Sequence, residues 1–225
     1  MGKFNAATDL DNYASSSSYF SLPDDGDEAI MHFMYNSVDD IDGYAVHRVN
    51  VNGYDRNVNC LRDYSDPLDK CPLCEARYKT IAKFFVNLYN AETGEVKVWE
   101  RGQNFYPQMK EDLGMLKNLA TYPVRITRHG AKGDKNTTYE LLAVEPSLMT
   151  YGKVTMDDFP DVEDPLGTYI LDKTYDELVT YVQTGSFETG DNNPVNRQDT
   201  TEVRRRRDVS SSPVSRRNTS TDVPL

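Results

Sequence analysis

Residues 44–61 read YAVHRVNVNGYDRNVNCL, with an Asn-Gly pair between two runs of β-forming residues. In that setting Asn-Gly is the strongest short signal for a two-residue hairpin turn. A turn at 52–53 sets Ala45 opposite Cys60. Because side chains alternate between the two faces of a strand, His47 and Cys60 then lie on the same face as diagonal neighbours, roughly 7–8 Å apart. The stretch therefore predicts a hairpin that presents two possible metal ligands side by side.

The remaining two cysteines follow the hairpin in the sequence CPLC at residues 71–74, so that all three cysteines of the chain lie in this region. Zinc takes about four nitrogen or sulfur ligands at tetrahedral corners, and a Cys-x2-Cys pair supplies two thiolates from one turn. We therefore predict one structural zinc ion held by His47, Cys60, Cys71 and Cys74. The segment between Asp63 and Lys79 is expected to be a loop wrapped on the ion.

The cysteines allow three other interpretations. A thioredoxin-like redox motif needs a Cys-x-x-Cys at the head of a helix in a βαβ unit, and this motif follows a β-hairpin. A zinc deaminase needs His-x-Glu and Pro-Cys-x-x-Cys, whereas Val49 stands where the Glu is needed and Lys70 precedes Cys71. Three buried reduced thiols with a core histidine remain the simplest alternative. His32 and His129 have no ligand-like neighbours in the sequence and are expected to be structural.

Composition indicates a chain that is only partly folded. Its 225 residues are 38% hydrophobic with a mean hydropathy of −0.68, which is low for a wholly globular protein. No apolar run approaches the roughly 20 residues of a membrane span, and residues 1–12 lack a signal-peptide core. Three clustered cysteines fit metal binding in a reducing compartment. We expect a soluble, intracellular protein with no membrane association.

The net charge of −11 is unevenly distributed. Residues 40–135 carry fifteen Lys and Arg against thirteen acids, whereas residues 136–196 carry two against twelve. Residues 197–225 carry seven arginines against four acids. The slightly basic block thus contains the metal motif, and the acidic flanks are either solvated faces or partner-binding segments.

The periodicity of residues 19–145 predicts a mainly β domain. A strand at 29–35 and three hairpins, at 44–61, 83–101 and 124–144, surround one helix at 103–120. That order suits an OB-fold, a five-stranded Greek-key barrel. A β-sandwich is the alternative. Residues 1–18 are expected to be flexible, 146–184 to be an acidic segment with a short helix capped by Thr174, and 185–225 to be a disordered, Arg-containing tail.

Binding to single-stranded nucleic acid needs cations along the phosphates and flat rings on which bases stack. The basic block interleaves both, and Trp99 is the best candidate platform because Lys97 and Arg101 share its face while Val96 and Val98 occupy the other. The predicted DNA-binding residues are Tyr44, Arg48, Tyr54, Arg56, Arg62, Lys97, Trp99, Arg101, Phe105, Tyr106, Arg128, Lys132 and Tyr139.

The spacing of His47, Cys60, Cys71 and Cys74, followed by VKVWERG at 96–102, resembles the zinc-containing single-stranded-DNA-binding proteins of tailed bacteriophages. The resemblance covers roughly residues 19–145. It implies an OB-fold with a zinc subdomain inserted at about 44–80, a cleft between the two that takes single-stranded DNA, and roles in replication, recombination and repair in the cytoplasm of the infected bacterial host. The resemblance assigns the zinc-ligand roles to His47, Cys60, Cys71 and Cys74 individually. It assigns the DNA-binding role to the aromatic and basic residues of the hairpins only as a group.

We therefore expect a DNA-binding protein without enzymatic activity that keeps single strands unpaired, with possible replication or recombination partners at its acidic segment. A rival interpretation is an OB-fold adaptor that recruits replication or host proteins through the acidic segment and the tail. Removal of residues 146–225 should distinguish them, because the first interpretation predicts intact DNA binding. A zinc hydrolase is a third interpretation, and it would need an open metal position beside a general base.

Overall fold

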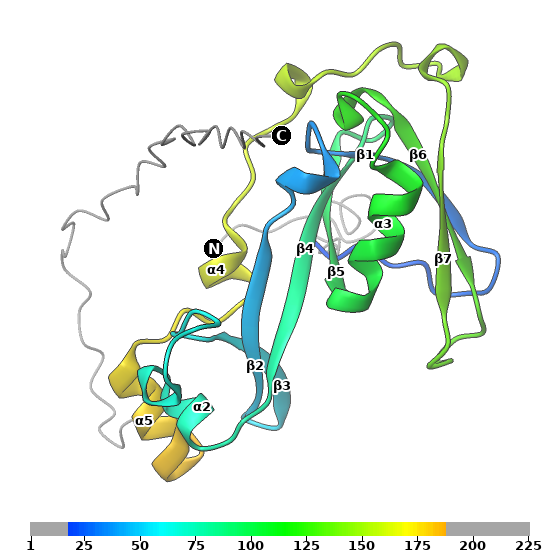
Figure 1. The fold of residues 1–225 in the computed structure, drawn as a ribbon. Coiled ribbons are helices and arrows are strands. Elements are labelled where there is room, and N and C mark those ends of the chain that lie inside the picture. Colours follow the sequence, from blue (N-terminus) through cyan, green and yellow to red (C-terminus); the bar gives the residue numbers. More distant parts are fainter. Residues whose placement is uncertain (1–17, 188–225) are drawn as a thin grey trace, which may run out of the picture. The chain divides into compact units, whose positions relative to one another are not determined.

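The computed structural model describes residues 18–187 (Figure 1). The predicted flexible N-terminus and disordered tail therefore fall almost entirely outside the described residues. At both boundaries, order extends further than predicted. The Ser18 carbonyl accepts a hydrogen bond from the Val98 N–H at 2.7 Å, and the Phe187 ring stacks on Tyr181 with centroids 4.6 Å apart.

The described chain is mainly β, as predicted. Its seven strands form one antiparallel sheet in the order β3-β2-β4-β1-β6-β7, with β5 paired to β4. The strands are β1 (Glu28–Phe33), β2 (Gly43–Val51), β3 (Tyr54–Asn59), β4 (Thr80–Asn90), β5 (Glu95–Gly102), β6 (Pro123–His129) and β7 (Thr138–Ala143). All three predicted hairpins are confirmed.

The register of the first hairpin is the predicted one. Val51 pairs with Tyr54, and the Cys60 N–H donates to the Ala45 carbonyl at 3.0 Å. Asn52 and Gly53 have φ values of 53° and 85°, as a type I′ turn requires. This turn fixes which face of the hairpin carries the ligands.

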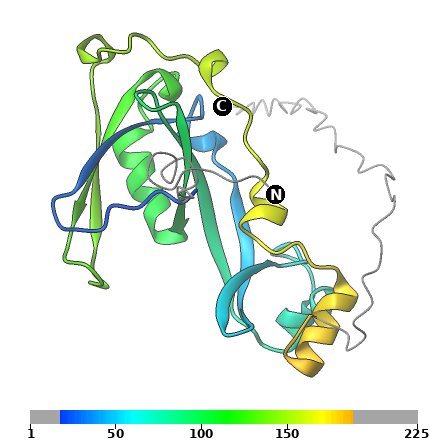
Figure 2. The same cartoon turned by 180° about the vertical axis from the view of Figure 1, so that it is seen from behind.

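Strand β4 connects the two parts of the sheet. Its first residues pair with β2 and its last with β1, while β5 runs along its other edge (Figures 1 and 2). The β2–β3 hairpin thereby extends away from the main core, which gathers Phe33, Trp99, Met109, Leu113 and Ile126. This arrangement separates the main core from a second packed region, here called the metal-ligand lobe, which consists of the β2–β3 hairpin, residues 60–79 and residues 171–187.

The sheet is not closed into the predicted five-stranded barrel. Within residues 18–187 no backbone hydrogen bonds join β5 to β7. Side chains bridge the two strands instead: the Trp99 and Tyr139 rings meet edge to face with centroids 5.2 Å apart. Packing between aromatic rings takes the place of a hydrogen-bonded ladder.

The predicted helix at 103–120 is shorter than expected. Helix α3 covers only Tyr106–Leu113, preceded by η4 (Gln103–Phe105) and followed by η5 (Leu119–Thr121). After Gly114 the chain turns back, and the N–H groups of Leu119 and Ala120 donate to the carbonyls of Asn36 and Tyr35. Tertiary hydrogen bonds to the residues that follow β1 thus replace the last helical turns.

The acidic segment is part of the folded unit. It carries η6 (Pro146–Leu148), η7 (Met156–Asp158), α4 (Pro165–Thr168) and α5 (Tyr175–Thr184), and it runs back along the sheet to the metal-ligand lobe (Figure 2). Thr174 caps α5 through a capping box with Glu177, as predicted. Leu171 exchanges backbone hydrogen bonds with Asn57 and Asn59 of β3.

The short η2 (Val38–Asp40) lies between β1 and β2. No described helix is long and apolar enough to cross a membrane.

Candidate metal centre and nucleic-acid interface

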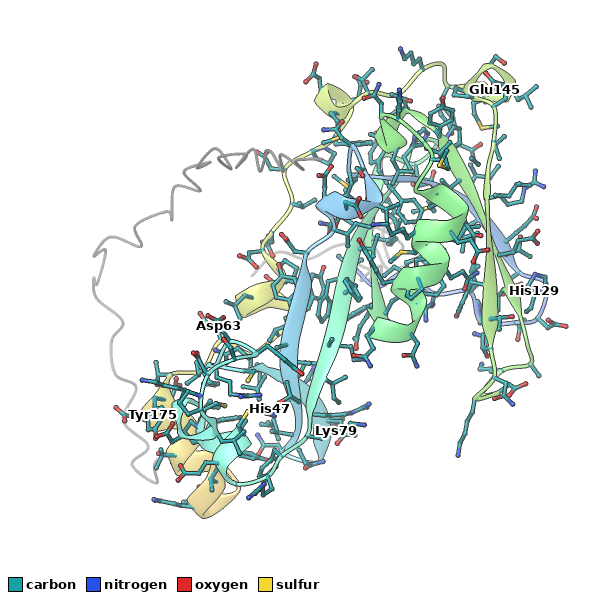
Figure 3. The ribbon with its side chains drawn as sticks, viewed as in Figure 1. His47, Asp63, Lys79, His129, Glu145 and Tyr175 are labelled. Atoms are coloured by element: carbon teal, nitrogen blue, oxygen red, sulfur yellow. The ribbon has the colours of Figure 1, made fainter. Side chains whose placement is uncertain are left out.

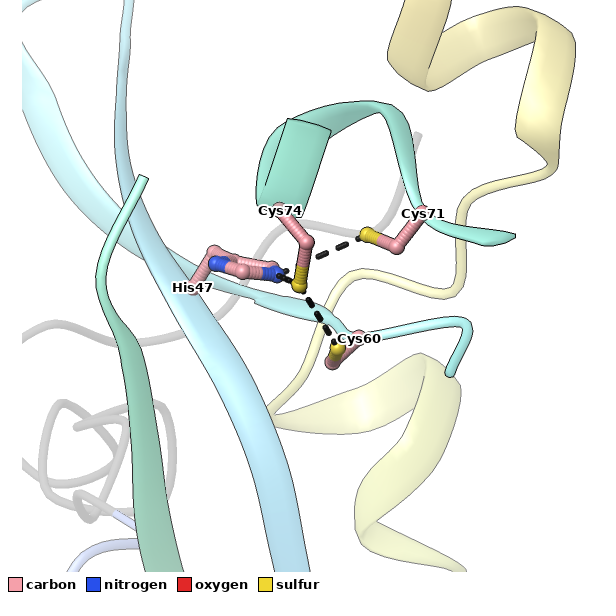
Figure 4. Close-up of side chains that lie close together, drawn as sticks. All are labelled: His47, Cys60, Cys71 and Cys74. Atoms are coloured by element: carbon pink, nitrogen blue, oxygen red, sulfur yellow. Dashed lines mark hydrogen bonds between the residues drawn. The ribbon is translucent and has the colours of Figure 1, made fainter. Parts of the chain in front are cut away.

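The four predicted ligands come together in one cluster whose ligand atoms lie within 4.8 Å of one another (Figure 4). His47 Nε2 is 3.5 Å from Sγ of Cys71 and 3.5 Å from Sγ of Cys74, and the sulfurs of Cys60 and Cys74 are 3.6 Å apart. Zn–S bonds near 2.3 Å and Zn–N bonds near 2.0–2.1 Å give tetrahedral edges of roughly 3.5–3.8 Å. These three separations match the edges of a tetrahedral zinc site, and all four ligand atoms lie within 4.8 Å of one another.

His47 is oriented by its other ring nitrogen. Nδ1 lies 3.2 Å from the Lys79 carbonyl oxygen, which can only accept, so Nδ1 carries the proton and Nε2 faces the sulfurs. Zinc-binding histidines are usually held by such a bond from the second nitrogen. His47 and Lys79 lie together in this lobe, whereas His129 lies on the β6–β7 hairpin away from the ligands (Figure 3).

The segment 63–79 is more regular than the loop predicted from its Asp and Pro content. It contains η3 (Leu68–Lys70) and a single turn, α2 (Pro72–Glu75). Proline at the first helical position suits the turn, because its missing N–H has no intrahelical acceptor there. Arg77, at φ 66°, ends the turn, and the Tyr78 N–H donates to the Leu73 carbonyl at 2.8 Å. The turn holds both of its cysteines toward His47.

The local hydrogen bonds favour thiolate at Cys71. The bond from the Cys60 thiol lowers the pKa of Cys71 to about 3, and His47 and the Leu61 N–H act in the same direction. The same bond raises the pKa of Cys60. Thr80 Oγ1 lies 3.5 Å from the Cys74 sulfur. A cation that replaced the shared proton would stabilise all three thiolates together.

The ligand cluster is shielded by apolar side chains from both the hairpin and α5. Val58, Leu73 and Leu178 are fully buried around it, and Tyr181 is 6% exposed. Four protein ligands inside such a shell form a closed site, which is typical of structural rather than catalytic zinc.

The structure contradicts the expectation that Trp99 is a stacking platform. Trp99 is 1% exposed because the Phe105 and Tyr139 rings cover the face that the alternation pattern assigned to solvent. The Arg101 guanidinium lies over the Trp99 ring at 4.3 Å and over the Tyr139 ring at 4.2 Å. These four predicted DNA-binding residues form one half-buried cluster at the gap between β5 and β7.

Several other predicted contacts are held by neighbouring groups. Arg128 donates to the carbonyls of Leu22, Gly130 and Ala131 and so fixes the β6–β7 loop. Arg62 donates to the Asp66 carbonyl, and Lys97 forms an ion pair with Glu95. The Tyr106 hydroxyl bonds to Asp39 and its ring stacks on Phe84. The Tyr44 hydroxyl bonds to Asp164 and its ring meets Phe85 edge to face. In this structure these side chains stabilise the fold locally.

The first hairpin retains the exposed part of the predicted set. Tyr54 is 69% exposed, Arg56 is exposed beside it on β3, and Arg48 is exposed but paired with Asp55 at 3.1 Å. Lys132 is exposed in the β6–β7 loop. At the metal-ligand lobe the exposed Tyr54 ring therefore lies beside Arg56, which forms no ion pair among the described residues.

The sequence interpretation missed Tyr64 and Tyr78, which are 98% and 38% exposed. Tyr64 sits at the corner of a tight turn in which the N–H of Asp63 donates to the Asp66 carboxylate at 3.0 Å. The sequence DYSDP at 63–67 is a turn pattern, and a ring at its corner has no neighbour to pack against. That pattern could have identified Tyr64.

Comparison with known proteins leaves the family of this chain open, since no family model and no curated protein matches it.

Proposed function

We propose that this chain binds single-stranded DNA with little sequence preference and that one structural zinc ion holds its binding lobe in shape. The observation that supports this most strongly is the convergence of His47, Cys60, Cys71 and Cys74, in the spacing that resembles phage single-stranded-DNA-binding proteins, on a hairpin with exposed rings and cations.

The surface chemistry of the lobe fits such a ligand. Stacking on an aromatic ring contributes about 1–3 kcal/mol per base whichever base it is. Tyr54 and Tyr64 offer rings that do not serve the core. Among the described residues, Arg56, Arg77 and Lys79 are exposed and form no ion pair, so they remain available to phosphates.

In this proposal zinc does no chemistry. Four protein ligands leave no open position for water or substrate, and the Leu73 and Leu178 side chains exclude solvent. In this proposal the protein is a binder and not an enzyme. It would coat exposed strands during phage replication, recombination and repair in the cytoplasm of the infected bacterial host, using an OB-type sheet left open between β5 and β7.

The test is a titration of 5′-labelled oligo-dT and of a duplex of equal length at several salt concentrations. The single strand should bind more tightly, and its affinity should fall steeply with salt because phosphate contacts release counterions. Tyr54→Ala should weaken binding by about 5- to 100-fold. Tyr175→Ala, which changes an exposed ring on α5, is the matched control and should have little effect. Equal affinity for duplex would exclude this function.

An adaptor function is the second candidate. The observation that favours it is that the acidic segment is folded against the sheet with Asp157, Asp161 and Glu163 exposed. An ordered acidic surface can recognise a basic partner. Binding of a partner with no binding of single strands would favour this candidate over the first.

A further inference from the structure

The helical turn that carries Cys71 and Cys74 ends in a Schellman motif. The Arg77 N–H donates to the Cys74 carbonyl at 3.0 Å, and the Tyr78 N–H donates to the Leu73 carbonyl at 2.8 Å. These two hydrogen bonds define this way of ending a helix, and they place residue 77 at its left-handed position, with φ 66°. Because the same turn supplies two metal ligands, the motif fixes where Arg77 stands in the metal-ligand lobe.

Arginine is an unfavourable residue at this position. Glycine usually occupies it, because a left-handed backbone brings the Cβ of any other residue too close to the following carbonyl oxygen. Within residues 18–187 only Asn52 and Asn118 also combine a side chain with a positive φ, and asparagine tolerates that conformation. Arg77 is therefore the one described residue at which an intolerant side chain holds a left-handed turn.

The fold offers no local compensation for the Arg77 side chain. Arg77 is exposed, and its guanidinium forms no ion pair, hydrogen bond or cation–π contact with any of residues 18–187. Residues that break a local conformational preference without an internal gain are expected at functional sites. The strained arginine therefore points to a ligand from outside the described chain.

The neighbours of Arg77 favour a ligand that combines negative charge with flat rings. Lys79 is exposed and forms no ion pair in the described part of the chain, and the Tyr78 ring is 38% exposed while it meets Tyr181 edge to face. The segment is held in place because His47 Nδ1 donates to the Lys79 carbonyl at 3.2 Å. A fixed order of cation, ring and cation suits the phosphates and bases of a single strand better than an acidic peptide, whose carboxylates give a ring nothing to stack on.

We propose that Arg77 binds a phosphate of the single strand, in the bidentate geometry that a guanidinium offers, and that the metal-ligand turn presents it for this purpose. The inference rests on the proposed function and adds a contact outside the DNA-binding set predicted from the sequence. It requires opposite effects on folding and on binding. Removal of the arginine relieves the backbone and at the same time removes a phosphate contact.

Arg77→Gly in the full chain tests both effects. Its thermal unfolding midpoint should rise by about 2–4 °C, because glycine adopts the left-handed conformation without strain, and its zinc content should stay the same. Its affinity for labelled oligo-dT should fall about 3- to 10-fold at about 0.1 M salt. The slope of log affinity against log salt concentration should become shallower by about 0.7, the share of one phosphate contact on a single strand. Arg77→Lys, which keeps the charge and the strain, should keep most of the slope.

The matched control is the double change Lys117→Gln with Asn118→Gly, just before η5. It also removes one positive charge and replaces one left-handed residue with glycine, but both positions are exposed and lie outside the metal-ligand lobe. Its affinity for oligo-dT should stay within about twofold of wild type, and its salt slope should not change.

Wild-type affinity and slope in Arg77→Gly, or an equal loss in the control, would overturn the inference. A lower unfolding midpoint or a loss of zinc in Arg77→Gly would also overturn it, since the arginine would then serve the fold. If the wild type still prefers oligo-dT to duplex in these cases, the proposed function stands and only the Arg77 contact fails. A wild type without that preference would overturn both.

Discussion

The Tyr181 hydroxyl is held by both backbone groups of Asn50: it accepts from the N–H at 3.1 Å and donates to the carbonyl at 3.0 Å. Helix α5 is thereby fastened to β2, and Leu178 fills the space between them and the metal-ligand turn. The C-terminal part of the acidic segment completes the metal-ligand lobe.

Tyr181→Phe should lower the free energy of unfolding by about 1–2 kcal/mol, because the change leaves the Asn50 N–H and carbonyl without their partner. Urea unfolding followed by circular dichroism measures the effect. Tyr175→Phe is the control, since this ring on the same helix is 44% exposed. If the free energy of unfolding falls in Tyr175→Phe but not in Tyr181→Phe, the role given to Tyr181 is refuted.

Purified protein should contain one zinc ion per chain by elemental analysis. Cys71→Ser should lose the metal and lower stability by several kcal/mol, because a structural zinc ion contributes its binding energy to folding. Ser65→Ala, an exposed change in the same region, should keep both. If the metal-free Cys71→Ser variant keeps full stability, the zinc ion has no structural role, and the site is better described as a cluster of reduced thiols.

The hairpin register and the ligand set could be predicted from the sequence because both depend on local signals. Asn52 and Gly53 adopt positive φ, and that geometry fixes the register for the whole hairpin. From there the positions of His47 and Cys60 follow by counting. Only the Cys-x2-Cys pair had to fold back from further along the chain.

The environment of β5 could not be predicted in the same way. Alternation correctly placed Val98 and Trp99 on opposite faces, but both faces are buried. Ile170 of the acidic segment packs in the cluster on the Val98 side, and Tyr139 of β7 packs on Trp99. These covering residues lie far from β5 in the sequence, and no local pattern in β5 predicts their contacts.

Stability should fall as the pH drops below about 6.5, the ordinary pKa of histidine, because of His32. His32 is 1% exposed between the Ala120 carbonyl and the Tyr151 hydroxyl, and burial lowers its pKa. The unfolded chain then gains a proton that the folded chain does not, which costs up to about 1.4 kcal/mol per pH unit until the folded-state pKa is reached. His32→Gln should remove this part of the pH dependence in urea unfolding. His129→Gln, an exposed change, should leave it in place.

Truncation after residue 187 should preserve zinc content and cooperative unfolding, whereas truncation after residue 145 should abolish both. The longer deletion removes Leu178, whose loss alone should cost about 2–5 kcal/mol, and it exposes the shell around Cys71. On this expectation, removal of 146–225 would not leave the DNA-binding lobe intact, in contrast to the prediction from the sequence. Thermal unfolding and metal analysis of the two shortened chains test this, and a stable, zinc-loaded 1–145 chain would contradict it.

Trp99 fluorescence should not report DNA binding. The only tryptophan of the chain is 1% exposed, so its emission should be that of a buried indole, weakly quenched by acrylamide and unchanged by oligo-dT. Trp99→Phe should lower stability by about 1–3 kcal/mol through altered core volume while leaving DNA affinity within about twofold. The indole N–H has no partner in this structure, so the change leaves no acceptor unpaired. Strong quenching by oligo-dT together with loss of affinity in Trp99→Phe would mean that the β5–β7 gap opens and that bases reach the ring.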